Sequence, residues 1–160
     1  MTATPQILAI DPQRRTNAAA VADAATLGWI GDHVIDVTHN VGRFWRTWQP
    51  THLVRCDLDP DGTLAAAGLI DVRADARRLP FPDRWADTTV FDPPYKLNGT
   101  GGSVAEDAGY GVDDRWNDRR DLYQQAMPEC ARVTRIGGTV MVKCQDQTAS
   151  GRWHSQTEHV

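Results

Sequence analysis

Lysine, cysteine and long apolar segments are all scarce in this 160-residue sequence. No apolar run approaches the roughly 18 residues that a membrane-spanning helix needs, and the first residues lack the basic start and apolar stretch of a secretory signal. The three cysteines are far apart, so their spacing supports neither a disulfide framework nor a cysteine metal site. These absences predict a cytoplasmic protein without a membrane span or a bound metal.

The charge is equally informative, because the net charge is −4 and only Lys96 and Lys143 are lysines among the 17 basic residues. A protein that holds a long stretch of nucleic acid is usually basic, since neutralising phosphates provides most of its affinity. The balance therefore argues mildly against a stand-alone duplex binder. Apolar residues are 41 % and charged residues 24 %, which is typical of a globular chain, and the length suits a single domain over 1–160.

Short apolar segments alternate with helical ones, which is typical of a parallel sheet with crossover helices. Strands are expected at 33–38, 52–56, 70–74, 88–91 and 139–143. Helices are expected at 17–27, 43–49 and 63–67, and from 113 or 114 to about 135. Residues 1–30 are then a helical lead-in, 96–113 a long active-site loop, and 145–160 a polar tail in which no strand is expected.

The most specific motif is Asp92-Pro93-Pro94-Tyr95, directly after the fourth expected strand. Two consecutive prolines can continue neither a strand ladder nor a helix, so they rigidify the strand end. In an open α/β sheet, ligands bind outside the carboxyl ends of the strands. The motif therefore presents a carboxylate, a fixed carbonyl and an aromatic ring at that edge. This set suits an exocyclic amine on a flat base: Asp92 and the Pro93 carbonyl accept its two N–H groups, and Tyr95 stacks on the ring.

With this motif the sequence resembles the S-adenosylmethionine-dependent amine methyltransferases that carry a D-P-P-Y signature, chiefly DNA adenine-N6 and cytosine-N4 methylases. The resemblance extends from about residue 17 to residue 144. It implies a Rossmann-like class I methyltransferase fold, an α/β fold with a mostly parallel sheet and helices on both faces. The catalytic residues that it implies are Asp92, Pro93, Pro94 and Tyr95.

The resemblance also implies where the cofactor S-adenosyl-L-methionine binds. Asp36, Thr38 and Gly42 belong to its first motif, which lies under the methionine end. Asp57, at the end of the second expected strand, would accept from both ribose hydroxyls. Asp75 and Ala76 fall in the third motif, which contacts the adenine. The implied reaction is direct methyl transfer to an exocyclic amine of a nucleobase, with adenine N6 in DNA as the leading substrate and no covalent enzyme intermediate.

Two departures keep alternatives open. The family's first turn has more than one glycine, whereas here Val41 precedes the single glycine Gly42. The family's sheet ends in an antiparallel hairpin, and these last strands are expected to be missing here, as in a C-terminally truncated chain. Both departures favour an inactive remnant that acts as a binding module. Because the tetrapeptide does not separate bases cleanly, an RNA or cytosine-N4 amine methyltransferase is the other alternative, although aspartate as its first residue favours adenine. The oligomeric state is left open.

Overall fold

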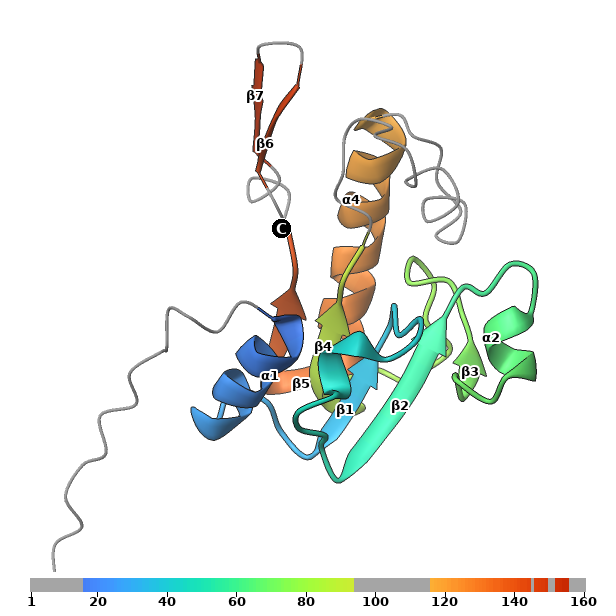
Figure 1. The fold of residues 1–160 in the computed structure, drawn as a ribbon, viewed down its shortest axis with the longest axis vertical. Helices are drawn as coiled ribbons and strands as arrows, with labels where there is room; N and C mark the ends of the chain where they lie inside the picture. Colours follow the sequence, from blue (N-terminus) through green and yellow to red (C-terminus); the bar gives the residue numbers. More distant parts are fainter. Residues whose placement is uncertain (1–15, 94–115, 145, 150–151, 156–160) are drawn as a thin grey trace, which may run out of the picture.

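A five-stranded, all-parallel sheet in the order β3-β2-β1-β4-β5 forms the centre of the fold (Figure 1). The computed structural model describes residues 16–93, 116–144, 146–149 and 152–155. The strands are β1 (His33–Asp36), β2 (His52–Asp57), β3 (Val72–Arg73), β4 (Ala86–Phe91) and β5 (Thr134–Val142). The helices are α1 (Asn17–Thr26), the 3₁₀ turn η1 (Arg43–Trp45), α2 (Thr63–Ala66) and α4 (Trp116–Val133). The expected α/β class with a mostly parallel sheet is confirmed.

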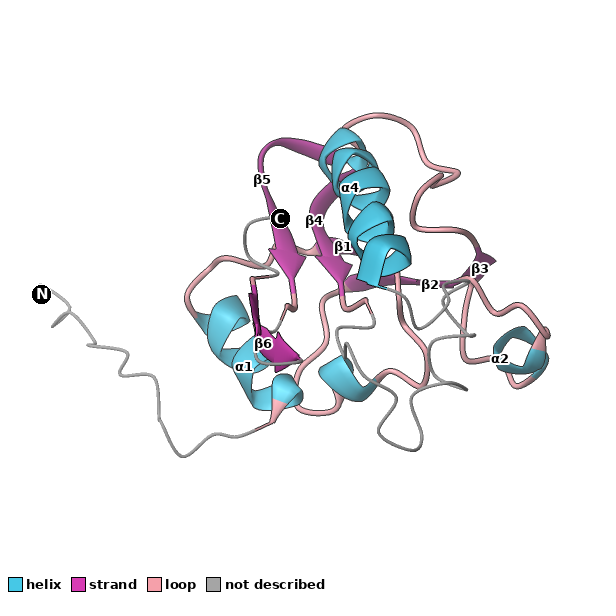
Figure 2. Cartoon of the chain, turned by 90° about the horizontal axis from the view of Figure 1, so that it is seen from above, coloured by secondary structure: helices cyan, strands magenta, loops and turns pink. Residues whose placement is uncertain are grey.

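Helices cover both faces of the central strands, as expected. Val34 and Val90 belong to the buried cluster that packs with α1 and η1. Their neighbours Ile35 and Phe91 belong to the cluster on the other face, which packs with α4. Figure 2 shows α1 and α4 on opposite sides of the sheet. Because successive strand residues point to opposite faces, each of these two strands has buried apolar residues on both faces of the sheet.

The expected caps are confirmed for the helix α1, but the expected bounds are not confirmed for the helix over 43–49. The Oγ1 atom of Thr16 accepts a hydrogen bond from the Ala19 N–H at 3.2 Å, and Gly28 has a φ of 75° after the last turn, so α1 is capped as predicted. The helix expected over 43–49 is wrong in length, because only Arg43–Trp45 form one 3₁₀ turn. Its last residue, Trp45, is buried against the sheet and donates its indole N–H to Asp36.

Two strands differ in length from the expectation. β5 begins at Thr134 rather than at 139, because α4 ends at Val133 and passes into the strand without a separate turn. Gly138 makes this possible, since a Cβ atom there would lie 2.5 Å from the carbonyl oxygen of Asp87 on β4. β3 contains only Val72–Arg73, and the carboxylate of the preceding Asp71 accepts from the N–H and the guanidinium of Arg55 on β2.

The expectation that no strand follows Cys144 is wrong. β6 (Gln147–Ala149) pairs antiparallel with β7 (Arg152–His154) in a small sheet of its own (Figure 1). Polar strands this short carry no periodic pattern that sequence reasoning can detect. The hairpin is separate from the five-stranded sheet, in which β5 is the last strand. None of the described helices is long and apolar enough to cross a membrane.

Candidate active site

The strand order reverses between β1 and β4. From β1 the chain moves to β2 and β3 on one side, and it then returns to β4 and β5 on the other side. Loops that leave the carboxyl ends of two such strands diverge, and open α/β sheets bind ligands in the crevice between them. Thr38 and Gly42 follow β1, and Asp92 and Pro93 follow β4. The fold therefore brings the two main predicted motifs to the edge where a ligand site is expected.

Asp36 holds the turn that leaves β1. Its side chain is only 4 % exposed. Oδ2 accepts from the Trp45 indole at 2.6 Å and contacts Nδ1 of His39 at 2.9 Å, and Oδ1 accepts from the Thr38 N–H at 3.3 Å. The carboxylate thus binds three groups of its own chain. The predicted contact between Asp36 and the cofactor stays a prediction.

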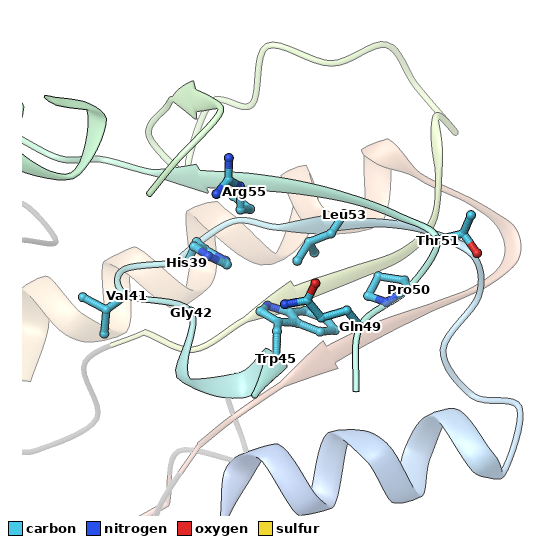
Figure 3. Close-up of a pocket in the computed structure, with 9 residues that line it drawn as sticks. All are labelled: His39, Val41, Gly42, Trp45, Gln49, Pro50, Thr51, Leu53 and Arg55. Atoms are coloured by element: carbon cyan, nitrogen blue, oxygen red, sulfur yellow. The ribbon is translucent and has the colours of Figure 1, made fainter. Parts of the chain in front are cut away.

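Gly42 is required by the same turn. It has a φ of 68°, and a Cβ atom there would lie 2.8 Å from Nε2 of His39. Asn40 also has a positive φ, of 50°, which asparagine adopts more readily than most residues. The side chain of Val41 is directed outward, and the residue is 44 % exposed (Figure 3). The β-branched residue in the turn therefore does not fill the edge between β1 and β4.

Four of the predicted cofactor residues line one narrow hollow beside α4. They are Thr38, Asp57, Asp75 and Ala76. The hollow has a volume of about 10 Å³, room for about one water molecule. A nucleoside is much larger, so it would lie over this edge with only part of it in the hollow. Asp36 and Gly42 do not line this hollow.

Asp57 connects the turns after β1 and β2. Its Oδ2 accepts from the Asn40 N–H at 2.8 Å, and its Oδ1 accepts from the Asp59 N–H at 3.3 Å. Burial raises the pKa of Asp57, and these hydrogen bonds oppose the rise. Each carboxylate oxygen can accept a second hydrogen bond. Asp57 therefore retains the acceptor capacity that a ribose hydroxyl needs, and it fits the role predicted for it.

Asp75 is bound by a neighbouring cation. Arg77 donates from Nη2 to its Oδ2 at 2.7 Å and from Nε to its Oδ1 at 2.9 Å. Burial alone would raise the pKa of Asp75, but the hydrogen bonds and charge of Arg77 outweigh it and the pKa lies below its usual value. The carboxylate is therefore charged at neutral pH. Adenine contacts by Asp75 and Ala76 stay a prediction.

Asp92 lies at this edge of the sheet, in contact with a hydroxyl group and a cation. Its N–H donates to Oγ1 of Thr38 at 2.7 Å, which fixes the end of β4 to the turn after β1. Nζ of Lys143 lies 3.1 Å from Oδ1 and donates a hydrogen bond of 3.3 Å to Oδ2. Oδ1 is buried and receives no hydrogen bond from the described residues. Burial raises the pKa of Asp92, Lys143 opposes the rise, and the charge of Asp36 adds to it.

The rest of the predicted catalytic motif is only partly described. Pro93 is buried directly after Asp92. Pro94, Tyr95 and the expected active-site loop at 96–113 lie outside the described residues. Sequence reasoning missed Lys143 as part of this site. Its one signal was its place as the last residue of the fifth expected strand, because Asp92 directly follows the end of the fourth.

A second, wider hollow opens over β2 beside η1 (Figure 3). It has a volume of about 410 Å³, and Gly42, Trp45, Leu53 and Arg55 are among its lining residues. The guanidinium of Arg55 is bound by Asp71 and by the Gly68 carbonyl. Asp92 does not line this hollow. Among the described residues, no three His, Cys, Asp or Glu side chains are grouped so that they could hold a metal ion.

Comparison with known proteins assigns no function to the chain. No protein-family model matches the chain, and no curated protein matches it with significant similarity.

Proposed function

We propose that this protein is an S-adenosylmethionine-dependent methyltransferase that acts on an exocyclic amine of a nucleobase, with adenine N6 in DNA as its leading substrate. The observation that carries the proposal is the largely buried carboxylate of Asp92, which is paired with Lys143 and whose Oδ1 atom makes no hydrogen bond with the described residues. It lies at the topological switch point of a parallel sheet, where ligands of such folds bind. A carboxylate at this position can accept the N–H of an amine.

The residues of this chain would act mainly by positioning. Asp92 accepts one amine N–H, the Pro93 carbonyl accepts the other, and the nitrogen lone pair is left free to attack. S-adenosylmethionine supplies a methyl group on a positively charged sulfur, whose carbon–sulfur bond breaks as the nitrogen–carbon bond forms. Positive charge develops on the amine nitrogen, and the carboxylate of Asp92 stabilises it before the extra proton leaves to solvent. A base in a duplex would have to flip out to reach this edge.

Asp57 is the residue best placed to hold the cofactor, through its ribose hydroxyls. It lines the same hollow as Thr38, whose hydroxyl fixes Asp92. A ribose on Asp57 and an amine on Asp92 would therefore lie on the two sides of one turn, the one after β1. This adjacency supports cofactor and substrate sites that share one edge of the sheet.

The test is a methyl-transfer assay with wild-type protein and Asp92→Ala. Each protein is incubated with DNA oligonucleotides and S-adenosylmethionine. The DNA is then digested to nucleosides, which are identified by mass spectrometry. We expect Asp92→Ala to lower the rate by about 10²-fold or more, because an electrostatic contact to the reacting nitrogen is lost. The matched control is Asp121→Ala, since Asp121 is exposed and, among the described residues, its side chain makes only a 3.7 Å contact with Arg120. Full activity in Asp92→Ala would contradict the catalytic assignment.

The same assay, run on DNA and on RNA oligonucleotides, separates the substrate alternatives. N6-methyladenine in DNA supports the leading proposal, whereas N4-methylcytosine or a methylated RNA base supports the other amine methyltransferases. The second candidate function is a binding module without transfer activity, which the small volume of the hollow at Asp57 favours. Nucleic-acid binding with no cofactor binding and no product in any substrate would support that candidate.

A further inference from the structure

Lys143 meets Asp92 because of the register between two neighbouring strands. Phe91 of β4 pairs with Val142 of β5, so the next residues, Asp92 and Lys143, leave the sheet at the same level. The Lys143 N–H donates to the Phe91 carbonyl at 2.9 Å, which extends the ladder by one bond. Parallel neighbours in register place their side chains on the same face. The pairing of the carboxylate with the ammonium is thus a consequence of the sheet itself.

The ammonium also lies over an aromatic ring. Nζ lies 5.7 Å from the ring centroid of Phe44, which is buried in η1, in an arrangement suited to a cation–π contact. The side chains of Lys143 and Asp92 are only 27 % and 23 % exposed. The ammonium therefore lies between a carboxylate and an aromatic face, where solvent screens its charge only in part.

The two oxygens of Asp92 are not equivalent in this arrangement. Lys143 makes its hydrogen bond to Oδ2, whereas its 3.1 Å contact with Oδ1 lacks hydrogen-bond geometry. We propose that Lys143 is a positioning residue for amine methylation: its ammonium pairs with both oxygens of Asp92 and keeps the carboxylate charged, as an acceptor for an N–H of the substrate amine. This inference rests on the proposed function, because it assigns the Asp92 carboxylate to the amine.

The charges around Asp92 explain why a cation is needed there. The described groups whose charges act on Asp92 are Lys143 after β5 and Asp36 at the end of β1. Burial and the negative charge of Asp36 both favour the protonated carboxyl, which is a poorer acceptor for an amine N–H. Lys143 acts in the opposite direction. Its removal should therefore raise the pH at which Asp92 loses its proton.

The experiment combines carbon-13 NMR titration of the Asp92 carboxyl with the pH profile of kcat/KM. The variants are Lys143→Met, Lys143→Arg and the control Arg135→Met, which removes a cation paired with Asp87 near the opposite end of the same two strands. We expect the Asp92 carboxyl to titrate at higher pH in Lys143→Met than in wild type. We also expect its kcat/KM to fall by about tenfold or more on the acid side, because losing an opposite charge at this distance has that typical effect. Lys143→Arg should restore both quantities, and Arg135→Met should change neither.

The outcomes separate this inference from the proposed function. An unshifted Asp92 titration in Lys143→Met overturns the inference, whatever the activity. A uniform loss of kcat/KM at all pH values also overturns it, since a merely structural role would act in that way. If wild-type protein transfers no methyl group while the titration still shifts, the proposed function fails and the effect of Lys143 on the carboxylate stands. If Lys143→Met does not melt cooperatively, Lys143→Arg is the deciding variant. In Lys143→Arg the Asp92 carboxyl must then titrate at the same pH as in wild type.

Discussion

Buried aspartates near the carboxyl ends of β1 and β2 differ in the donors that reach them. Asp36 binds Thr38, His39 and Trp45 within its own turn. Asp59 accepts from the Leu64 and Ala65 N–H groups, both at 3.0 Å, and so fixes the start of α2. The sequence placed acidic residues at these strand ends. It could not show that the side chains of Trp45 and His39 would contact the Asp36 carboxylate, because those contacts depend on how η1 packs.

Replacing Asp36 should cost stability rather than only cofactor affinity. We expect Asp36→Ala to lower the free energy of unfolding by roughly 2 kcal/mol or more, because the buried donors of Thr38 and Trp45 lose their acceptor. Urea denaturation measures this loss. The exposed control Asp121→Ala should stay within about 1 kcal/mol of wild type. Equal midpoints for the two variants would show that the turn does not depend on Asp36.

At the scale of elements, the order of the strands was predictable and their ends were not. Each of the five expected strands has a counterpart in the sheet, because apolar runs and the turns between them are local signals. β5 makes a close contact with Asp87 at Gly138, and Asp71, next to β3, is bonded to Arg55 of β2. Both are contacts between distant segments, which a local pattern does not contain.

The docking of α4 shows the same dependence on distant contacts. Arg132 at its last turn donates to the carbonyls of Leu79 and Phe81 and to the carboxylates of Asp83 and Glu129. Glu129 in turn accepts from the Leu79 N–H at 2.9 Å. The end of the helix is thus fixed to the connection between β3 and β4, the strand that Asp92 follows.

Glu129 makes part of this docking dependent on pH. The hydrogen bond from Arg132 holds the pKa of Glu129 below its usual value of 4.5, so the folded state binds the proton less tightly than the unfolded chain does. Its stabilisation is complete above the unfolded pKa and is lost as the pH falls through the folded one. We therefore expect Glu129→Gln to be less stable than wild type at neutral pH, and the difference to shrink as the pH falls below about 4.5. Urea denaturation midpoints of both proteins, at neutral pH and below pH 4.5, measure this difference in stability. The same difference at the two pH values would contradict the role of the Glu129 carboxylate.

At the scale of the whole molecule, the sheet places the buried carboxylate of Asp57 at the end of β2 and the carboxylate of Asp92 after β4, around the turn that follows β1. The sequence predicted this convergence because carboxyl ends of parallel strands share one edge. It could not predict that the hollow at Asp57 would be so small, since its width depends on how Phe91 and Leu122 pack beside it.

Replacement of Asp57 should separate cofactor binding from catalysis. We expect Asp57→Asn to weaken S-adenosylmethionine binding by about tenfold, because hydrogen bonds to a charged acceptor contribute roughly 1.5–3 kcal/mol. Asp92→Ala should bind the cofactor nearly as wild type does. Isothermal titration calorimetry compares the dissociation constants, and a stronger effect of Asp92→Ala than of Asp57→Asn would reverse the two assigned roles.

The central claim is that the carboxyl edge between β1 and β4 is a site for S-adenosylmethionine. The most direct test is a thermal melt of the wild-type protein over a titration with that cofactor. A ligand at 100 times its dissociation constant adds about 2.7 kcal/mol of stability, which moves the Tm of a domain of this size by several degrees. We expect a cooperative melt whose Tm rises steadily with the cofactor concentration. A cooperative melt that stays at the same temperature throughout the titration would contradict it.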